Sequence, residues 1–112
     1  MTKERTIANE FVSAAEREKL INILTDELPV LRAKLGISQN EVGTIIGVSR
    51  QTYSAIETKK RPMTWNTFLA LILFFDRNEK TKPILASIGA FPESLEQMLR
   101  TDRREDNSLI EE

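Results

Sequence analysis

The stretch "VGTIIGVSRQTYSAIE", residues 42–57, decides the fold. Apolar residues lead to Gly47, where a short helix can end, and Ser49 is a preferred N-cap for a second helix. The three-residue link "GVS" between two short helices predicts a helix-turn-helix. Gly43 lies on the face where the second helix would cross the first, and its missing side chain would let the two backbones approach closely.

The spacing of these residues also predicts which side chains face outward. The inward positions are Val42, Ile46, Val48, Tyr53 and Ile56, with the Tyr53 hydroxyl expected at the rim of the core. The second helix then presents Arg50, Gln51 and Ser54, with Thr52 and Ala55 beside them. Because arginine pairs with guanine and glutamine with adenine through two hydrogen bonds each, this surface fits the reading of base edges.

The rest of the chain has helical periodicity, and no segment alternates with the period of a strand. Ser13 and Glu16 form a capping-box pattern for a helix toward Leu24. A separate helix is expected in "TDELPVLRAKLG" (25–36), with Pro29 in its first turn, where a missing N–H is tolerated. Ser38 and Thr64 are further N-caps, and two short helices are expected after residue 78, with Pro83 and Pro92 just inside their starts.

Charge is distributed unevenly along the 112 residues, although the formal net charge is only -1. Residues 32–61 carry six basic and two acidic side chains, a net charge of +4, while the flanking segments are acidic. A basic segment between acidic flanks indicates a local surface for an anionic partner.

Several functional classes lack their usual residues. The chain has no cysteine and no histidine, which argues against thiolate or imidazole catalysis and the usual zinc and haem sites. The carboxylates at 26–27 and 102–106 have no partner acid, base or metal set, so we expect no enzyme activity, cofactor or metal. The N-terminus has no apolar signal segment, and the longest apolar run, "FLALILFF" (68–75), is too short for a membrane span. These features favour a cytoplasmic protein.

From Leu28 to about Phe75 the sequence resembles the helix-turn-helix domain of Cro and phage repressors, the XRE family. The segments that carry the resemblance are "LRAKLGISQNEV" (31–42) and "GVSRQTYSAIETKKRP" (47–62). The resemblance implies an all-α, compact five-helix lambda-repressor-like domain, here with extra N-terminal and C-terminal helices. It implies base contacts from Arg50, Gln51 and Ser54, for which Thr52 is a further candidate.

The same resemblance implies that Gln39 contacts a DNA phosphate and that Glu57 fixes the domain internally. Relatives often have glycine two residues after this glutamate, where the present chain has "TKKRP" (58–62). We expect Lys59, Lys60 and Arg61 to contact phosphates, because they follow the reading helix directly. Ser49, at the start of that helix, is a further candidate for a phosphate contact.

The apolar helix around 65–78 needs cover on every side. We expect a C-terminal helical segment, 79–100, to cover one side, and a second subunit to complete a homodimer that reads two half-sites roughly 34 Å apart. The predicted organisation is an N-terminal helical extension (1–23), the DNA-binding domain (24–78, motif 39–58), that C-terminal segment, and a disordered tail (101–112).

The sequence therefore predicts a sequence-specific regulator of transcription that binds double-stranded DNA, more readily a repressor than an activator. An alternative is a protein-interaction module, such as an antitoxin-like partner, with the same fold. The pI near 5.6 keeps this alternative open, since many DNA-binding proteins are more basic.

Overall fold

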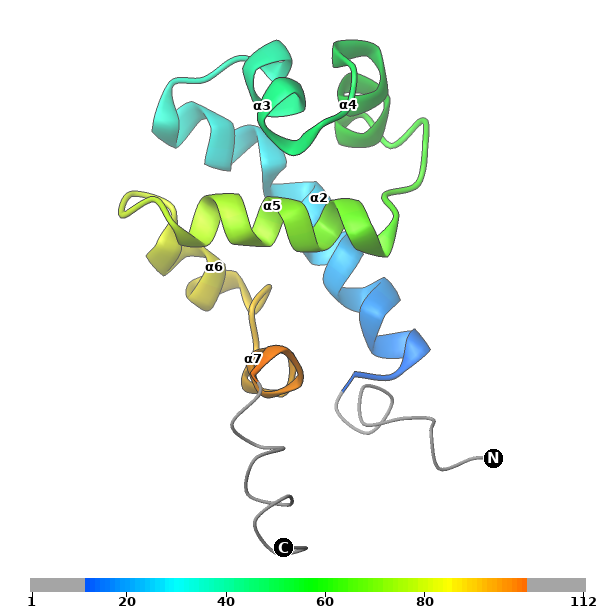
Figure 1. Cartoon of the computed structure of the whole chain (residues 1–112), viewed down its shortest axis with the longest axis vertical. Coiled ribbons are helices and arrows are strands. Elements are labelled where there is room, and N and C mark those ends of the chain that lie inside the picture. Colours follow the sequence, from blue (N-terminus) through cyan, green and yellow to red (C-terminus); the bar gives the residue numbers. More distant parts are fainter. Residues whose placement is uncertain (1–11, 101–112) are drawn as a thin grey trace, which may run out of the picture.

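The computed structural model describes residues 12–100 of the chain, and this part is all-α (Figure 1). Its helices are α2 (Ala14–Leu35), α3 (Gln39–Ile46), α4 (Arg50–Glu57), α5 (Trp65–Asp76), α6 (Lys82–Ile88) and α7 (Glu93–Leu99). The predicted all-α, lambda-repressor-like fold class is confirmed. The segment expected to be a disordered tail lies outside the described residues.

Helix α2 is one continuous element of 22 residues. The predicted break near Leu24 is wrong, because Pro29 lies inside the helix rather than in a first turn. Leu24, Leu28 and Leu31 are fully buried along one face while Pro29 is exposed. Burial of this apolar face stabilises the helix through the proline, at the cost of one backbone hydrogen bond. The helix begins at the Ser13 cap and ends at Gly36, which has a φ of 67°.

Helices α3 and α4 form the predicted helix-turn-helix at one end of the molecule (Figure 1). The Ser38 hydroxyl and the Glu41 carboxylate make a complete capping box at the start of α3. Gly47 ends α3 with a φ of 86°, a left-handed conformation that favours glycine. The backbone N–H groups of Gly47 and Val48 both donate to the Gly43 carbonyl, each at 2.8 Å, which closes the turn.

Gly43 is a point of close backbone contact, as the sequence predicted, but the contact is between α3 and the turn that leads into α4. A Cβ atom built there would lie 2.8 Å from the Val48 carbonyl oxygen, nearer than two such atoms can approach. The turn can therefore pack back on α3 only because residue 43 lacks a side chain.

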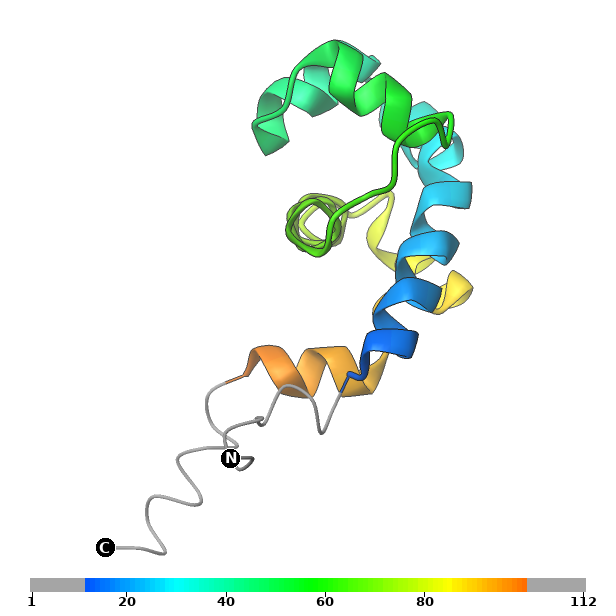
Figure 2. The same ribbon diagram turned by 90° about the vertical axis from the view of Figure 1, so that its right-hand side faces the viewer.

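Helix α5 passes beneath this pair and forms the centre of the core (Figures 1 and 2). Phe68, Leu71, Ile72 and Phe75 are buried, whereas Leu73 is 63% exposed. Trp65 stacks on Phe68 with ring centroids 4.7 Å apart, and the Arg17 guanidinium of α2 lies 4.9 Å from the centre of the Trp65 ring. Helices α2 and α5 are thus joined by apolar packing and by a cation–π contact.

The C-terminal helices α6 and α7 add to this core, as predicted. Leu85 and Leu95 are buried, but Leu99 is half exposed and does not share their role. Pro83 lies in the first turn of α6 as expected, whereas Pro92 is the N-cap residue of α7 rather than part of it. In Figure 2, α2 runs along one side of the molecule. The pair α3–α4, then α5, then α7 follow one another beside it along the long axis.

Candidate nucleic-acid interface

The N-terminal end of α4 presents the residues predicted to read bases. Ser49 caps the helix by accepting a hydrogen bond from the Thr52 N–H at 3.0 Å, while Tyr53 and Ile56 anchor its opposite face in the core. Arg50 and Gln51 are exposed. A rigid helix thus holds a guanidinium and an amide in solvent at its first turn, the pair of groups that suits base edges.

Ser54 and Thr52 are less accessible than these two. Both are half-buried, and the Thr52 hydroxyl oxygen lies 3.0 Å from Ser49 Oγ and 3.4 Å from Arg61 Nη1. Thr52 is therefore engaged within the protein as well as facing outward. Its predicted base contact stays a prediction.

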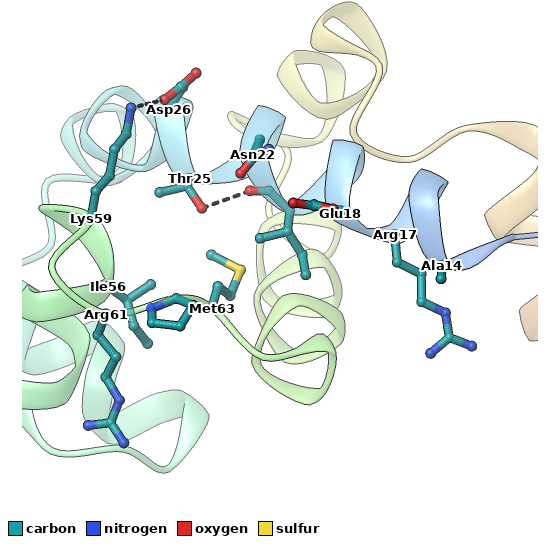
Figure 3. A pocket seen from close by; sticks show the side chains of 12 residues that line it. Ala14, Arg17, Glu18, Asn22, Thr25, Asp26, Ile56, Lys59, Arg61 and Met63 are labelled. Carbon is teal, nitrogen blue, oxygen red and sulfur yellow. Dashed lines mark hydrogen bonds and ion pairs between the residues drawn. The ribbon is translucent and has the colours of Figure 1, made fainter.

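Two of the three cations after α4, Lys59 and Arg61, point in different directions (Figure 3). Lys59 pairs with Asp26 of α2, and Arg61 reaches back to Thr52 near the start of α4. Lys60 is exposed. Arg61 therefore lies near the N-terminal end of α4, whereas Lys59 is directed toward α2. The spacing of these residues in the sequence does not show this difference.

Lys59 also has an unusual backbone conformation. Its φ of 66° is the only positive φ of a non-glycine residue in the described part of the chain. The position is the one where relatives often have glycine, two residues after Glu57. Lys59 thus adopts a left-handed conformation that costs about 1–2 kcal/mol for a residue with a side chain.

A partly buried ion pair joins α2 to the C-terminal end of α4, the helix that carries the predicted base-reading residues. Arg32 Nε donates to Glu57 Oε1 at 2.9 Å and Arg32 Nη2 donates to Oε2 at 2.8 Å. Arg32 Nη1 also donates to the Ile37 carbonyl at 3.1 Å. The Glu57 side chain is only 6% exposed, so its role is internal, as the resemblance implied. The partner Arg32 lies 25 residues away and could not be assigned from the sequence.

The electrostatics of this pair follow from its geometry. Burial is the largest single influence and acts to raise the pKa of Glu57, but the hydrogen bonds and positive charge of Arg32, together with smaller contributions from neighbouring side chains, outweigh it, so the pKa lies below its ordinary value. The Gln39 side chain contributes in the same direction, which places this predicted phosphate contact near the ion pair. Glu57 is thus ionised at neutral pH and compensates the positive charge of Arg32.

Tyr53 differs from its prediction. The residue is fully buried, and its hydroxyl has no hydrogen bond of acceptable geometry in the described structure, so it does not lie at a solvated rim. Burial, followed by the nearby Glu57 carboxylate, raises the pKa of the Tyr53 hydroxyl. The ring fills the space between the helices, and the phenol stays neutral.

An open groove of about 750 Å³ lies between α2 and the loop after α4 (Figure 3). Ile21, Ile56 and Met63 supply apolar lining, and charged side chains, among them Lys59 and Asp26, also line it. The sequence predicted neither this groove nor the ion pair beside it. Its lining residues lie far apart along the chain.

The described residues contain no cluster of three or more acidic, cysteine or histidine side chains that could hold a metal ion. None of the helices of residues 12–100 has the length and apolar character needed to cross a membrane.

Comparison with known proteins gives a match at the family level. The helix-turn-helix family matches residues 31–76, a segment that runs from the end of α2 through α5. No curated protein and no solved structure shows significant similarity to the chain. The matched family suggests DNA binding and a role in transcriptional regulation. Residues 31–76 therefore form a helix-turn-helix domain of the Cro/C1 type, the XRE family.

Proposed function

We propose that this protein is a sequence-specific repressor of transcription that inserts the N-terminal end of α4 into the major groove of double-stranded DNA. The observation that carries the proposal is the exposure of Arg50 and Gln51 at the first turn of a helix whose other face is anchored in the core. Ser54 and Thr52 lie on the same helix and complete the proposed base-reading set. A protein bound in this way would block access to a promoter.

Phosphate contacts are proposed around this reading surface. Gln39 and Ser49 occupy the starts of α3 and α4, while Lys59, Lys60 and Arg61 follow α4. The segment 32–61 carries a net charge of +4, with six basic and two acidic residues. Such contacts would set affinity and register without selecting a sequence.

We further propose a homodimer in the cytoplasm. The support is apolar surface that remains on α5 and α7 of the described chain, where Leu73 is 63% and Leu99 50% exposed. Two subunits would place two reading helices on half-sites roughly 34 Å apart. Analytical ultracentrifugation tests this arrangement, and a monomeric mass at micromolar concentration would contradict it.

Selection from a random duplex library, followed by sequencing of the retained DNA, tests the central proposal. The wild-type protein should enrich one motif, present twice if the protein is a dimer. A variant with Arg50→Ala and Gln51→Ala should lose this preference and keep weak, salt-sensitive binding. The matched control carries Lys80→Ala and Asn66→Ala, which remove one cation and one amide from exposed positions elsewhere. If the first variant still selects the same motif, the proposed reading surface is wrong.

The alternative function is a protein-interaction module with the same fold. Ile45 in α3 is 55% exposed and Val30 in α2 is 49% exposed, and the chain is acidic overall with a pI near 5.6. Exposed apolar side chains suit a protein partner better than a phosphate backbone. Co-purification of a protein in stoichiometric amount, together with no enrichment of any DNA motif, would favour this function.

A further inference from the structure

Arg61 is bound to α4 through both its backbone and its side chain. The backbone N–H groups of Lys60 and Arg61 donate to the Ala55 carbonyl at 2.8 and 3.1 Å, which ties the loop to the last turns of the helix. The side chain then runs back along α4, and its Nη1 lies 3.4 Å from Thr52 Oγ1. A residue nine positions further along the chain is thereby placed beside the first turn of the helix.

Thr52 is the residue that receives this side chain. Its hydroxyl oxygen accepts hydrogen bonds from Ser49 Oγ at 3.0 Å and from Arg61 Nη1 at 3.4 Å. With both acceptor positions occupied, the hydroxyl hydrogen remains to donate. The guanidinium has five N–H donors and uses one here, and Arg61 is an exposed residue, so further donors remain for a ligand.

We propose that Thr52 is a positioning residue that holds the Arg61 guanidinium beside the first turn of α4, so that Arg61 contacts a DNA phosphate at this end of the helix. The inference rests on the proposed function, in which it replaces the base contact of Thr52 by this positioning role and leaves base reading to Arg50, Gln51 and Ser54. The guanidinium alone can offer several N–H donors to one anion, and guanidinium–phosphate hydrogen bonds are among the strongest in proteins. Holding the side chain in place before DNA arrives lowers the entropy lost on binding.

Lys59 belongs to the same loop but does not lie beside the first turn of α4. Position in the loop is therefore not enough to place a cation at that turn. Lys59 leaves the loop two residues earlier and pairs with Asp26 on α2 (Figure 3). Among the basic residues of this loop, Arg61 is the one with a hydrogen bond to α4 through its side chain in the described structure.

A double-mutant cycle on the full-length protein tests the inference. Thr52→Val removes the hydroxyl and keeps both the branched shape and the N–H that Ser49 caps. We expect it to weaken binding to the selected duplex and to an unrelated duplex alike, by about three- to tenfold. In the Arg61→Ala background the same substitution should have no further effect, and Thr52→Ser should restore wild-type affinity.

The same cycle with Lys60→Ala in place of Arg61→Ala is the matched control, and there the two losses should add. Thermal unfolding of each variant, monitored by circular dichroism, verifies that the fold is kept. An equal loss in the Arg61→Ala background, or a changed sequence preference, would show that Thr52 acts by itself and would overturn the inference. No loss with Thr52→Val would overturn it as well. If the wild-type protein binds no duplex at all, the proposed function fails together with the inference, an outcome distinct from binding without coupling.

Discussion

Arg32 and Glu57 join α2 to the end of α4 through two parallel hydrogen bonds of 2.9 and 2.8 Å. Arg32→Ala should lower the free energy of unfolding by about 2–4 kcal/mol, because it leaves a carboxylate that is almost fully buried without its counter-charge. Urea unfolding measures this difference. Lys34→Ala, which removes an exposed cation from the same turn of α2, is the control and should change stability by less than about 0.5 kcal/mol. Equal effects of the two substitutions would contradict the structural role of the pair.

The stability contributed by Glu57 should depend on pH. Its pKa in the folded protein is below the ordinary 4.5, so the folded state binds this proton less readily than the unfolded state. The contribution is therefore fully present above the unfolded pKa and is lost as the pH falls through the folded pKa. The difference in unfolding free energy between wild type and Glu57→Gln, measured by urea unfolding, should shrink as the pH is lowered from about 6 to about 3. A difference that stays constant over this range would contradict the assignment.

Gly43→Ala should destabilise the protein although alanine is the better helix former. The new Cβ would lie 2.8 Å from the Val48 carbonyl oxygen, so the turn would have to move away from α3. We expect a loss of about 2 kcal/mol in thermal or urea unfolding. Thr44→Ala, at the exposed neighbouring position, should be neutral or slightly stabilising. A neutral Gly43→Ala variant would mean that the close contact between α3 and the turn is not required.

Lys59→Gly should stabilise the fold. Glycine removes the strain of the positive φ at this position, and the gain exceeds the entropy that glycine adds to the unfolded chain, leaving about 0.5–1 kcal/mol. Lys59→Ala loses the ion pair with Asp26 but keeps the strain, so it should show no such gain. Unfolding in urea of the two variants separates the backbone effect from the effect of charge, and equal stabilities would contradict the strain.

Asp26→Asn should strengthen DNA binding if Lys59 contacts phosphate as proposed, because Asp26 holds the lysine ammonium in the free protein. Affinity for an unrelated duplex at two salt concentrations measures the change, and the affinity should also depend more steeply on salt. Glu18→Gln removes the same charge elsewhere on α2 and reports the general electrostatic effect. Similar gains from both variants would show that Asp26 does not act through Lys59.

Local signals explain why the helix-turn-helix could be predicted from the sequence. Ser38, Ser49 and Thr64 each accept a backbone hydrogen bond from the residue three positions later, so the start of each helix depends on neighbouring residues only. The turn at Gly47 and the close contact at Gly43 depend on one residue type each. Each of these features depends on residues within a few positions of one another, so each could be predicted from a short stretch of sequence.

The errors arose where a distant part of the chain decides the outcome. Pro29 remains inside α2 because Leu24, Leu28 and Leu31 pack on other helices, and local rules do not include that packing. Asp26 lies 33 positions before Lys59, and the Tyr53 hydroxyl is enclosed by residues that meet only in the fold. The direction of each cation after α4 could not be predicted for the same reason.

The continuity of α2 has a consequence for how this protein can be divided. The family match starts at residue 31, yet the helix that carries Leu31 begins at Ala14. A fragment cut at the start of the match would lose Leu20, Leu24 and Leu28, all buried against the domain it retains. The segment that matches the family is therefore shorter than the segment that builds the core, and a helix-turn-helix domain transplanted to another protein would have to be moved with the whole of α2.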